Sequence, residues 1–381
     1  MSSGGGSWWR QAGLANVLLF IVVFTLCDVG AAQLLRRILP QWRFEARGVV
    51  ERQYRIRSPL YHHDLKPLVD VMTVWGNITY RLTTNSLGFR DRTPREVPLR
   101  SRGRRVLFIG DSFTEGLGVP YESTFVGRIG RDWGVQGVEV LNAGVAGYSP
   151  AIYYRKIKYW IEERGLEVGS IVVCIDISDV YDEARQYLLA DDDRVEGIRP
   201  PAPSKLRQLR LFLKDNSVLL HVLGVAKDVI ENRKRYALGE EAGLWTESRS
   251  LFGSYGRLGL ARARANMDRL MLVARRHRVP VAIVVYPWPD QIAARNLNSL
   301  QVSFWSAWAR DRGATFIDLF PAFIDTANPR QTIRRDFIPY DYHWNAAGHA
   351  TVAAAILRSG LLPLAAPASG GPGPSAPVTR R

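Results

Sequence analysis

The residues most suited to chemistry in this chain begin with Ser112, in the stretch Gly-Asp-Ser-Phe-Thr-Glu-Gly at residues 110–116. The stretch follows the apolar run Val-Leu-Phe-Ile at 106–109, which is typical of a short buried strand, and Gly110 allows a sharp turn after it. Open α/β folds bind ligands at the carboxyl ends of such strands, so a serine here is placed to act as a nucleophile. The competing interpretation is that Asp111 or Ser112 merely caps the next helix.

A serine hydroxyl needs a base, and the segment 340–349 supplies a candidate. Its sequence is Tyr-Asp-Tyr-His-Trp-Asn-Ala-Ala-Gly-His, and its first histidine lies 343 − 112 = 231 residues beyond Ser112. His343 can take the serine proton, while Asp341 can orient the imidazole and stabilise its charged form. The fold has to bring these partners together. The second histidine, His349, is expected to be a helix residue packed on the sheet.

Four blocks in this order resemble the SGNH/GDSL hydrolase superfamily, over about residues 104–358. They comprise 110–112, 138–147, 171–179 and 341–343. The resemblance implies that Ser112 is the nucleophile and that its backbone N–H donates to the oxyanion. It implies a second N–H donor at Gly144, while Ser178 takes the place of an asparagine whose amide donates in the family. His343 and Asp341 complete the implied catalytic set.

The chain departs from the family pattern at two places. Ser178 replaces the asparagine and Asp176 replaces a glycine. Losing one oxyanion donor typically costs about two to three orders of magnitude in rate, and a carboxylate at residue 176 is unfavourable unless it points away from the site. Asp341 stands two residues before His343, whereas the common family spacing of three falls on Tyr340. An Asp-x-His pair resembles the polysaccharide O-acetyltransferase relatives of the superfamily.

Alternating apolar runs and helical patterns predict the elements that must position these residues. The runs are partly continuous, as in strands buried on both faces of a parallel sheet. Strands are expected at 106–109, 138–141, 171–177, 279–285 and 314–319. Helices are expected at 121–133, 151–164, 258–278, 291–312 and 346–358. This alternation predicts a three-layer α/β/α, flavodoxin-like sandwich with a parallel sheet, the SGNH hydrolase fold.

A long stretch at 180–256 does not fit this alternation, because loops above about 15 residues usually have a purpose of their own. It follows the strand that carries Ser178, so one interpretation is an insertion over the mouth of the active site. Its aromatic residues would then stack on a sugar ring; they are Tyr181, Tyr187, Trp245 and Tyr255. The alternative is a helical excursion packed far from the site.

The apolar segment 13–36 is long enough to span a bilayer, which takes about 20 residues. Asp28 is costly at depth unless it lies near the interface or has a partner. We therefore expect a single-pass transmembrane signal anchor, with a cleaved signal peptide as the alternative. Charge bias alone would leave the bulk of the protein in the cytoplasm, because Arg36 and Arg37 stand at the C-terminal end of the apolar run. The family resemblance implies the opposite, an extracytoplasmic (periplasmic) catalytic domain.

The remaining segments complete the expected organisation. Residues 1–12 are an N-terminal tail, 37–103 a juxtamembrane extension and 104–360 the hydrolase-like domain, followed by a disordered tail rich in Pro, Gly, Ala and Ser at 361–381. Within the extension, Arg90 could brace the catalytic sheet or meet an anionic substrate, and a structural ion pair is favoured.

The charge and cysteine content exclude several other classes of function. The net charge is +15, but the basic residues are spread and mostly arginine, with no nucleic-acid motif, so no nucleic-acid partner is expected. The two cysteines, Cys27 and Cys174, lie in an apolar helix and a strand, so neither a disulfide framework nor a metal site is expected. No cofactor is expected either.

These observations predict a membrane-anchored serine esterase or O-acyltransferase. Ser112 would attack an ester carbonyl, His343 would take its proton and Asp341 would orient His343. The oxyanion would be held by Ser112, Gly144 and Ser178, and the substrate would be an ester or acylated carbohydrate. The alternative is a catalytically degraded glycan-binding or assembly module, in which Asp176 and Ser178 have disabled the site.

Overall fold

The computed structural model describes residues 5–38, 47–76, 78–101, 103–198, 204–324 and 327–361. The chain divides into two compact units. The helical unit comprises Met1–Arg52 and Arg199–Ala237, and the sheet unit comprises Gln53–Ile198 and Leu238–Arg381. The tail expected to be disordered lies outside the described residues from position 362 onward.

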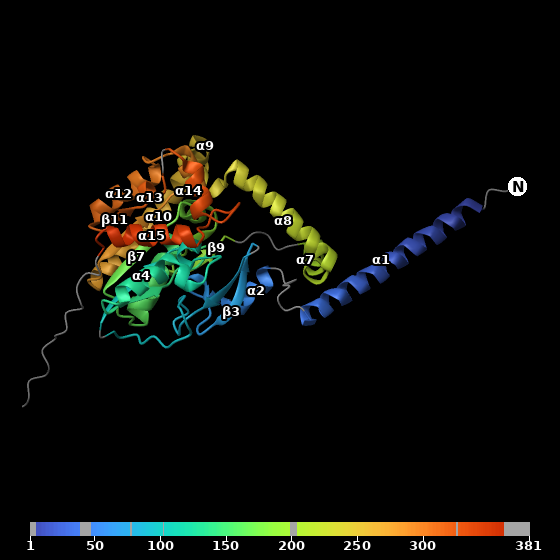
Figure 1. The fold of residues 1–381 in the computed structure, drawn as a ribbon, viewed down its shortest axis with the longest axis horizontal. Helices are drawn as coiled ribbons and strands as arrows, with labels where there is room; N and C mark the ends of the chain where they lie inside the picture. Colours follow the sequence, from blue (N-terminus) through green and yellow to red (C-terminus); the bar gives the residue numbers. More distant parts are fainter. Residues whose placement is uncertain are drawn as a thin grey trace, which may run out of the picture. The chain divides into compact units, whose positions relative to one another are not determined.

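Five parallel strands form the central sheet of the sheet unit, in the order β11-β10-β7-β5-β6 (Figure 1). The strands are β5 (Arg104–Ile109), β6 (Val138–Asn142), β7 (Ser170–Ile175), β10 (Val281–Val285) and β11 (Thr315–Asp318). Counted along the chain, this is the flavodoxin-like order 2-1-3-4-5. Every residue of β10 is buried, as the continuous apolar runs predict. The expected α/β fold with a parallel sheet is confirmed.

Helices between the strands pack in two groups. In one group α4 (Phe125–Gly134) packs against α15 (Ala346–Arg358). In the other, α10 (Arg257–Arg276) packs against α5 (Pro150–Lys158) and α6 (Asp179–Arg185). The other α-helices of the unit are α3 (Ser112–Glu115), α9 (Arg249–Leu251), α11 (Pro289–Ala294), α12 (Leu300–Arg312), α13 (Phe320–Phe323) and α14 (Pro329–Asp336).

The single helix expected at 291–312 is in fact two helices, α11 and α12. Arg295 adopts a left-handed conformation with φ of 56° and closes α11. Ser299 then begins α12, because its side chain accepts a hydrogen bond from the N–H group of Gln301. The polar residues between the two helices therefore form a break that the apolar periodicity did not reveal.

Two antiparallel hairpins precede the sheet and belong to the same compact unit. The first pairs β1 (Arg55–Ser58) with β2 (His62–Leu65), and the second pairs β3 (Asp70–Trp75) with β4 (Ile78–Thr83). The sheet unit thus begins at Gln53, well before the boundary expected at residue 104. The segment interpreted as a juxtamembrane extension is largely part of the sheet unit, because its hairpins bury side chains there.

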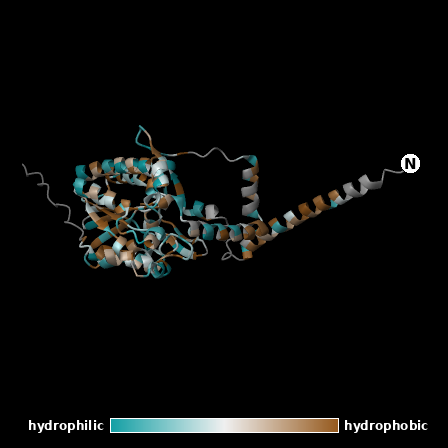
Figure 2. Cartoon of the chain, turned by 90° about the horizontal axis from the view of Figure 1, so that it is seen from above, coloured by the Kyte–Doolittle hydropathy of each residue, from teal (hydrophilic) through white to brown (hydrophobic). Residues whose placement is uncertain are grey.

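The helical unit contains α1 (Gly5–Ile38), most of α2 (Arg47–Tyr54), α7 (Lys205–Asn216) and nearly all of α8 (Val218–Leu238). Within α1, residues Gly13–Leu35 are long and apolar enough to cross a membrane, by length and composition. Figure 2 shows the hydrophobic colouring concentrated along this helix. The helix begins at Gly5, inside the segment expected to be a tail.

The insertion at 180–256 is divided between the two units. The part at 199–237, which contains α7 and nearly all of α8, is grouped with α1 in the helical unit. Its aromatic residues belong to the sheet unit, but Trp245 and Tyr255 are each only 1% exposed, and Tyr187 is also buried. The Trp245 indole donates to the carbonyl of Ile177 over 2.8 Å. These three rings are core residues and are not available to stack on a sugar.

Candidate active site

Ser112 is the first residue of α3, directly beyond the carboxyl end of β5. The Asp111 side chain caps this short helix by accepting a hydrogen bond from the N–H of Phe113. Only glycine fits sterically at position 110, because a Cβ there would lie 2.1 Å from Thr114 Oγ1 and 2.9 Å from the Cys174 carbonyl oxygen. The sequence therefore folds into a tight strand-to-helix turn, and Ser112 begins the helix.

Asp341 and His343 lie in the loop between α14 and α15. The loop is closed by the N–H of Ile338, which donates to the His343 carbonyl over 2.9 Å. Tyr340 has a left-handed φ of 60° and points the chain back. Asn345 then caps α15 by accepting hydrogen bonds from two N–H groups of its first turn. This turn makes an aspartate two residues before the histidine a suitable partner.

The structure brings Ser112, His343 and Asp341 into one continuous chain of contacts. His343 Nε2 lies 2.9 Å from Ser112 Oγ, and His343 Nδ1 lies 2.6 Å from Asp341 Oδ1. Asp341 Oδ1 also accepts the backbone N–H of His343 over 2.9 Å. The serine, imidazole and carboxylate are thus arranged as a nucleophile, a base and a group that fixes the base.

Trp75 at the end of β3 is a member of this site that the sequence analysis missed. Its indole Nε1 donates to Asp341 Oδ2 over 2.8 Å, and its ring meets the His343 ring edge-on at 4.7 Å between centroids. On the other side Phe113 stacks on the same imidazole at 4.9 Å. Burial tends to raise the pKa of Asp341, but His343 and the donated hydrogen bonds outweigh it and hold that pKa below its usual value.

Asp111 is a second acceptor beside the nucleophile. Its Oδ2 lies 2.9 Å from Ser112 Oγ, so this carboxyl competes with His343 for one hydroxyl proton. Burial, and then the nearby charge of Asp176, raise the pKa of Asp111 well above its usual value. A protonated Asp111 donates to Ser112 Oγ and leaves the serine proton to His343.

Two backbone N–H groups predicted to hold an oxyanion have different surroundings. The N–H of Ser112 donates to no acceptor within the described residues. The N–H of Gly144 donates to Asn142 Oδ1 over 3.1 Å. Gly144 lies against α3, because a Cβ there would be 2.6 Å from Thr114 Cβ and 3.0 Å from the Glu115 nitrogen. The glycine is thus beside the helix that carries Ser112, and its N–H is engaged within its own turn.

The third predicted donor, Ser178, is turned toward Asp176. Ser178 Oγ lies 2.5 Å from Asp176 Oδ1, and the backbone N–H of Ser178 donates to the same oxygen over 2.8 Å. Asp176 Oδ2 accepts the indole N–H of Trp288 over 2.9 Å. The two departures from the family pattern therefore form one buried unit, in which the serine hydroxyl is bonded to the carboxyl.

Behind the nucleophile, several carboxyl groups are buried together. Burial is the largest cause that raises the pKa of each, and repulsion from neighbouring carboxylates adds to it for Asp111, Asp179 and Asp182. The group consists of Asp111, Asp176, Asp179, Asp182 and Glu183. A raised pKa favours the neutral form, so the negative field of these groups at the serine is smaller than their number suggests.

Arg90 braces the turn that follows the nucleophile. Its guanidinium donates to the carbonyl oxygens of Glu115, Gly116 and Val119, at 2.6, 2.7 and 3.1 Å. The expected bracing role is thus present, although the partners are backbone carbonyls and not the anion of an ion pair. Glu115 itself is fully buried and meets Arg55 of the first hairpin at 2.9 Å.

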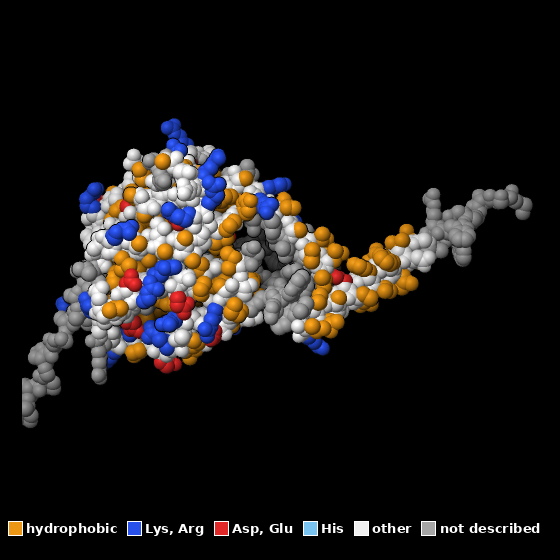
Figure 3. Space-filling model, viewed as in Figure 1, with side chains coloured by type: hydrophobic (Ala, Val, Ile, Leu, Met, Phe, Trp, Pro, Cys, Tyr) orange, Lys and Arg blue, Asp and Glu red, His pale blue; other side chains and the backbone are white. Residues whose placement is uncertain are grey.

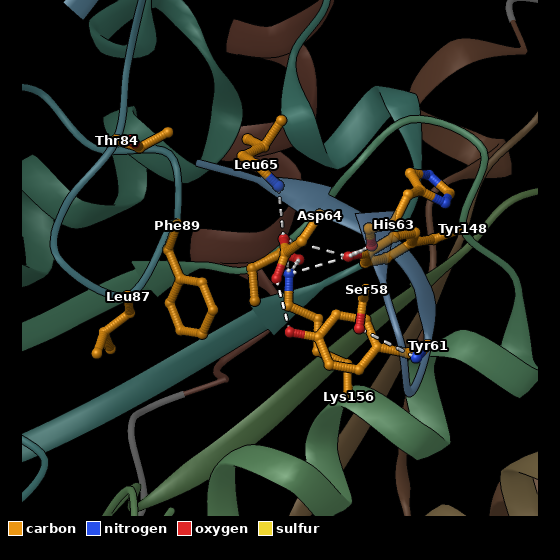
Figure 4. A network of polar contacts seen from close by, with 12 residues as sticks. Ser58, Tyr61, His63, Asp64, Leu65, Thr84, Leu87, Phe89, Tyr148 and Lys156 are labelled. Atoms are coloured by element: carbon orange, nitrogen blue, oxygen red, sulfur yellow. Dashed lines mark hydrogen bonds and ion pairs between the residues drawn. The ribbon is translucent and has the colours of Figure 1, made fainter. Parts of the chain in front are cut away.

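A buried polar network ties the first hairpin to the sheet unit (Figure 4). Lys156 Nζ on α5 lies 2.7 Å from Asp64 Oδ1 on β2, and the two side chains are 1% and 7% exposed. Tyr61 and Tyr148 direct their hydroxyl groups to the same carboxylate, at 2.8 and 3.3 Å. Burial lowers the pKa of Lys156, although Asp64 opposes the shift. The His63 ring, on the same hairpin, contacts the carbonyl of Ala146.

His349 lies apart from the reacting groups. It is 1% exposed, and its Nδ1 accepts the N–H of Phe125 over 3.2 Å. Burial lowers its pKa to about 3. Within the part of the chain that the structure describes, no group of three or more His, Cys, Asp or Glu side chains is arranged to hold a metal ion.

The fold and the site together define a parallel-sheet α/β protein with a Ser-His-Asp constellation at the carboxyl edge of its sheet. No protein-family model matches the chain, and no curated protein does.

Among solved structures, the chain is similar to a catalytic mutant of Axe2, an acetylxylan esterase from Geobacillus stearothermophilus, at 15% identity over 71% of this chain and 100% of that one, with a TM-score of 0.40. It is similar to a member of the lipolytic protein G-D-S-L family from Veillonella parvula DSM 2008 at 13% identity, covering 67% and 97%, with a TM-score of 0.36. It is also similar to the psychrotrophic esterase EstA from Pseudoalteromonas sp. at 9% identity, covering 67% and 96%, with a TM-score of 0.36.

Proposed function

We propose that the protein is a serine-dependent hydrolase or acyltransferase that acts on ester bonds. The observation that carries the proposal is the chain of contacts from Ser112 Oγ through the His343 ring to Asp341, at 2.9 and 2.6 Å. An imidazole bonded on one side to a carboxylate and on the other to a hydroxyl is the arrangement that activates serine for attack on a carbonyl carbon.

In the proposed reaction, Ser112 Oγ forms a bond to the ester carbonyl carbon while its proton moves to His343 Nε2. The protonated imidazole is stabilised by Asp341 and then gives the proton to the leaving alkoxide as the ester bond breaks. Water or a sugar hydroxyl attacks the acyl-serine next, with His343 again as the base. Hydrolysis and transfer differ only in this acceptor.

The free N–H of Ser112 supports a role in holding the oxyanion. The N–H of Gly144 would have to share its bond to Asn142 or leave it when substrate binds. Ser178 would contribute a donated proton only while Asp176 is neutral, since a neutral carboxyl can donate to the serine oxygen. The raised pKa of Asp176, which burial causes, supports that arrangement.

For the substrate, we propose an acetyl or similar ester on an exported or cell-envelope polysaccharide. The proposal combines the Asp-x-His pair, which resembles the O-acetyltransferase relatives, with an N-terminal helix apolar enough to span a membrane. The catalytic unit would then lie on the extracytoplasmic side. The alternative is a glycan-binding or assembly module without catalysis, favoured by the bond that holds the Ser178 hydroxyl to Asp176.

The test uses the full chain in detergent with a fluorophosphonate probe and an acetyl ester. We expect labelling and hydrolysis by the wild type, and loss of both in Ser112→Ala. Ser303→Ala, at an exposed serine on α12, is the matched control and should behave as wild type. If Ser112→Ala reacts as well as the wild type, the assignment is wrong. If neither protein reacts but both bind acetylated oligosaccharide, the binding module is the better description.

Hydrolysis and transfer are separated in the same preparation by adding acceptor oligosaccharides. Transfer predicts that an acetylated oligosaccharide forms at the expense of free acetate, and that both products disappear in Ser112→Ala. A yield of free acetate that is unchanged by any acceptor points to an esterase.

A further inference from the structure

In the helical unit, the turn between α7 and α8 is joined to the apolar helix α1 by polar contacts. The N–H of Leu219, in the first turn of α8, donates to Asp28 Oδ1 over 3.1 Å. Gln33 Nε2 donates to Asn216 Oδ1 over 3.4 Å. Ser217 caps α8 by accepting the N–H of Leu220. The carboxylate that was unexplained in α1 thus meets the positive end of a helix dipole.

The position of Asp28 sets the depth of this turn if α1 spans a bilayer. The apolar stretch ends at Leu35, which is 35 − 28 = 7 residues beyond Asp28. At a rise of 1.5 Å per residue, Asp28 lies about 10 Å inside the end of the stretch. Amphipathic helices at a membrane surface bury their apolar face about 5–10 Å deep. The start of α8 therefore lies at the depth that an interfacial helix reaches.

The side chains around the turn are apolar and uncovered. On α8 the exposed fractions are 45% for Leu219, 39% for Leu220, 53% for Val222 and 55% for Leu223. On α7 they are 76% for Leu206, 53% for Leu209 and 60% for Phe212. Figure 3 shows hydrophobic atoms over the described parts of these helices and along α1. Soluble proteins rarely expose an apolar surface of this extent.

The composition of α7 agrees with an anionic lipid surface as the partner. Its twelve residues, Lys-Leu-Arg-Gln-Leu-Arg-Leu-Phe-Leu-Lys-Asp-Asn, include four basic residues and one acidic residue. Helices that combine leucine and phenylalanine with lysine and arginine lie in the headgroup region of anionic membranes. A second protein chain would not explain why this surface adjoins the membrane-spanning candidate at the depth of Asp28.

We propose that α7 and the start of α8 form a membrane-bound helix-turn-helix segment, which lies beside α1 at the boundary between the headgroups and the acyl chains of an anionic bilayer. The inference rests on α1 spanning the membrane and is independent of the chemistry at Ser112. The chain would then be attached to the bilayer twice, through α1 and through the α7–α8 segment at one face of the membrane. The helical part of the 180–256 insertion is then a membrane contact and not a cover for the site.

The test places a nitroxide label at single cysteines in the full chain, reconstituted in vesicles of phosphatidylcholine and phosphatidylglycerol. The background is Cys27→Ala, since Cys174 is buried and unreactive toward the label. Leu223→Cys tests the α7–α8 segment. Leu19→Cys, inside the apolar stretch, is the lipid reference, and Val135→Cys, which is 88% exposed in the sheet unit, is the water reference.

Collision rates with oxygen and with a water-soluble nickel chelate report the surroundings of each label. We expect the collision rate with oxygen to exceed that with the chelate at positions 19 and 223, and the reverse at position 135. A label at 223 that resembles 135 overturns the proposal, and so does one shielded from both reagents, since that indicates cover by a second chain. If the label at position 19 is exposed to water, α1 does not span the bilayer and the proposal loses its premise. Ester hydrolysis measured on the same vesicles reports the proposed function separately.

Discussion

Replacement of Trp75 by phenylalanine isolates the hydrogen bond that this residue donates to the proposed triad. The substitution keeps an aromatic ring against the imidazole and removes only the indole N–H that reaches Asp341 Oδ2 at 2.8 Å. Asp341 accepts three hydrogen bonds, two of them from His343 itself. The variant therefore leaves the aspartate paired with the histidine but free to rotate about that contact.

The magnitude follows from the charge on the acceptor. Hydrogen bonds to charged groups contribute about 1.5–3 kcal/mol, and about 1.4 kcal/mol corresponds to a tenfold change in rate. Trp75 is half-buried, so water can replace part of the lost bond, and we expect the lower end of this range. The predicted effect is a decrease in kcat/KM of about tenfold, carried by kcat and not by KM.

The assay measures hydrolysis of an acetyl ester by the wild type, Trp75→Phe and Trp305→Phe across pH. Trp305 is the matched control, since its buried indole N–H has no hydrogen-bond partner within the described residues. With one donor fewer, Asp341 holds a protonated imidazole more firmly, so the acidic limb of kcat/KM should move to higher pH. Equal kcat in all three proteins with an unmoved pH profile would refute the positioning role of Trp75.

Three further predictions concern stability. Lys156→Met should cost about 3–5 kcal/mol in the free energy of unfolding, because it leaves the buried carboxylate of Asp64 unpaired; urea titration measures this, and a cost below about 1 kcal/mol contradicts it. His349 has a pKa of about 3 in the folded protein, against 6.5 for an ordinary histidine. Its neutral form therefore stabilises the fold fully above pH 6.5, and this stabilisation is lost as the pH falls. Urea titration above pH 6.5 and at pH 5 should show a loss of about 2 kcal/mol in the free energy of unfolding of the wild type, and a smaller loss in His349→Gln. Equal slopes for the two proteins would exclude His349 as the cause. Gly144→Ala should lower stability by about 1–3 kcal/mol and reduce ester hydrolysis, because the added Cβ meets Thr114 at 2.6 Å; an unchanged melting temperature would show that the turn yields easily.

The sequence predicted the five strands of the parallel sheet well, because continuous apolar runs leave few alternatives to buried parallel strands. It also paired His343 with Asp341 from residue types two positions apart. The structure adds the physical reason: Asp341 Oδ1 accepts both the ring and the backbone N–H of His343, in a loop turned by the left-handed Tyr340. Local spacing was sufficient there since both partners belong to one turn.

The sequence could not reveal contacts between distant segments that carry no motif. Trp75 lies 266 residues before Asp341 and is one of eleven tryptophans, so nothing in the local pattern distinguishes it. Helices α7 and α8 follow the strand of Ser178, and the sequence left open whether they cover the active site or pack far from it. Their contact with Asp28 is equally non-local. In both cases long-range packing, and not propensity, decided the outcome.

The buried pair of Lys156 and Asp64 has a consequence for how this protein can be divided. A fragment that begins at the first strand of the central sheet, at Arg104, would lack Asp64 and leave Lys156 unpaired in the interior. It would also lack Trp75, which donates a hydrogen bond to Asp341. A fragment that begins at Gln53 keeps both. The central sheet and the two hairpins before it therefore have to be kept together in any fragment that is to fold.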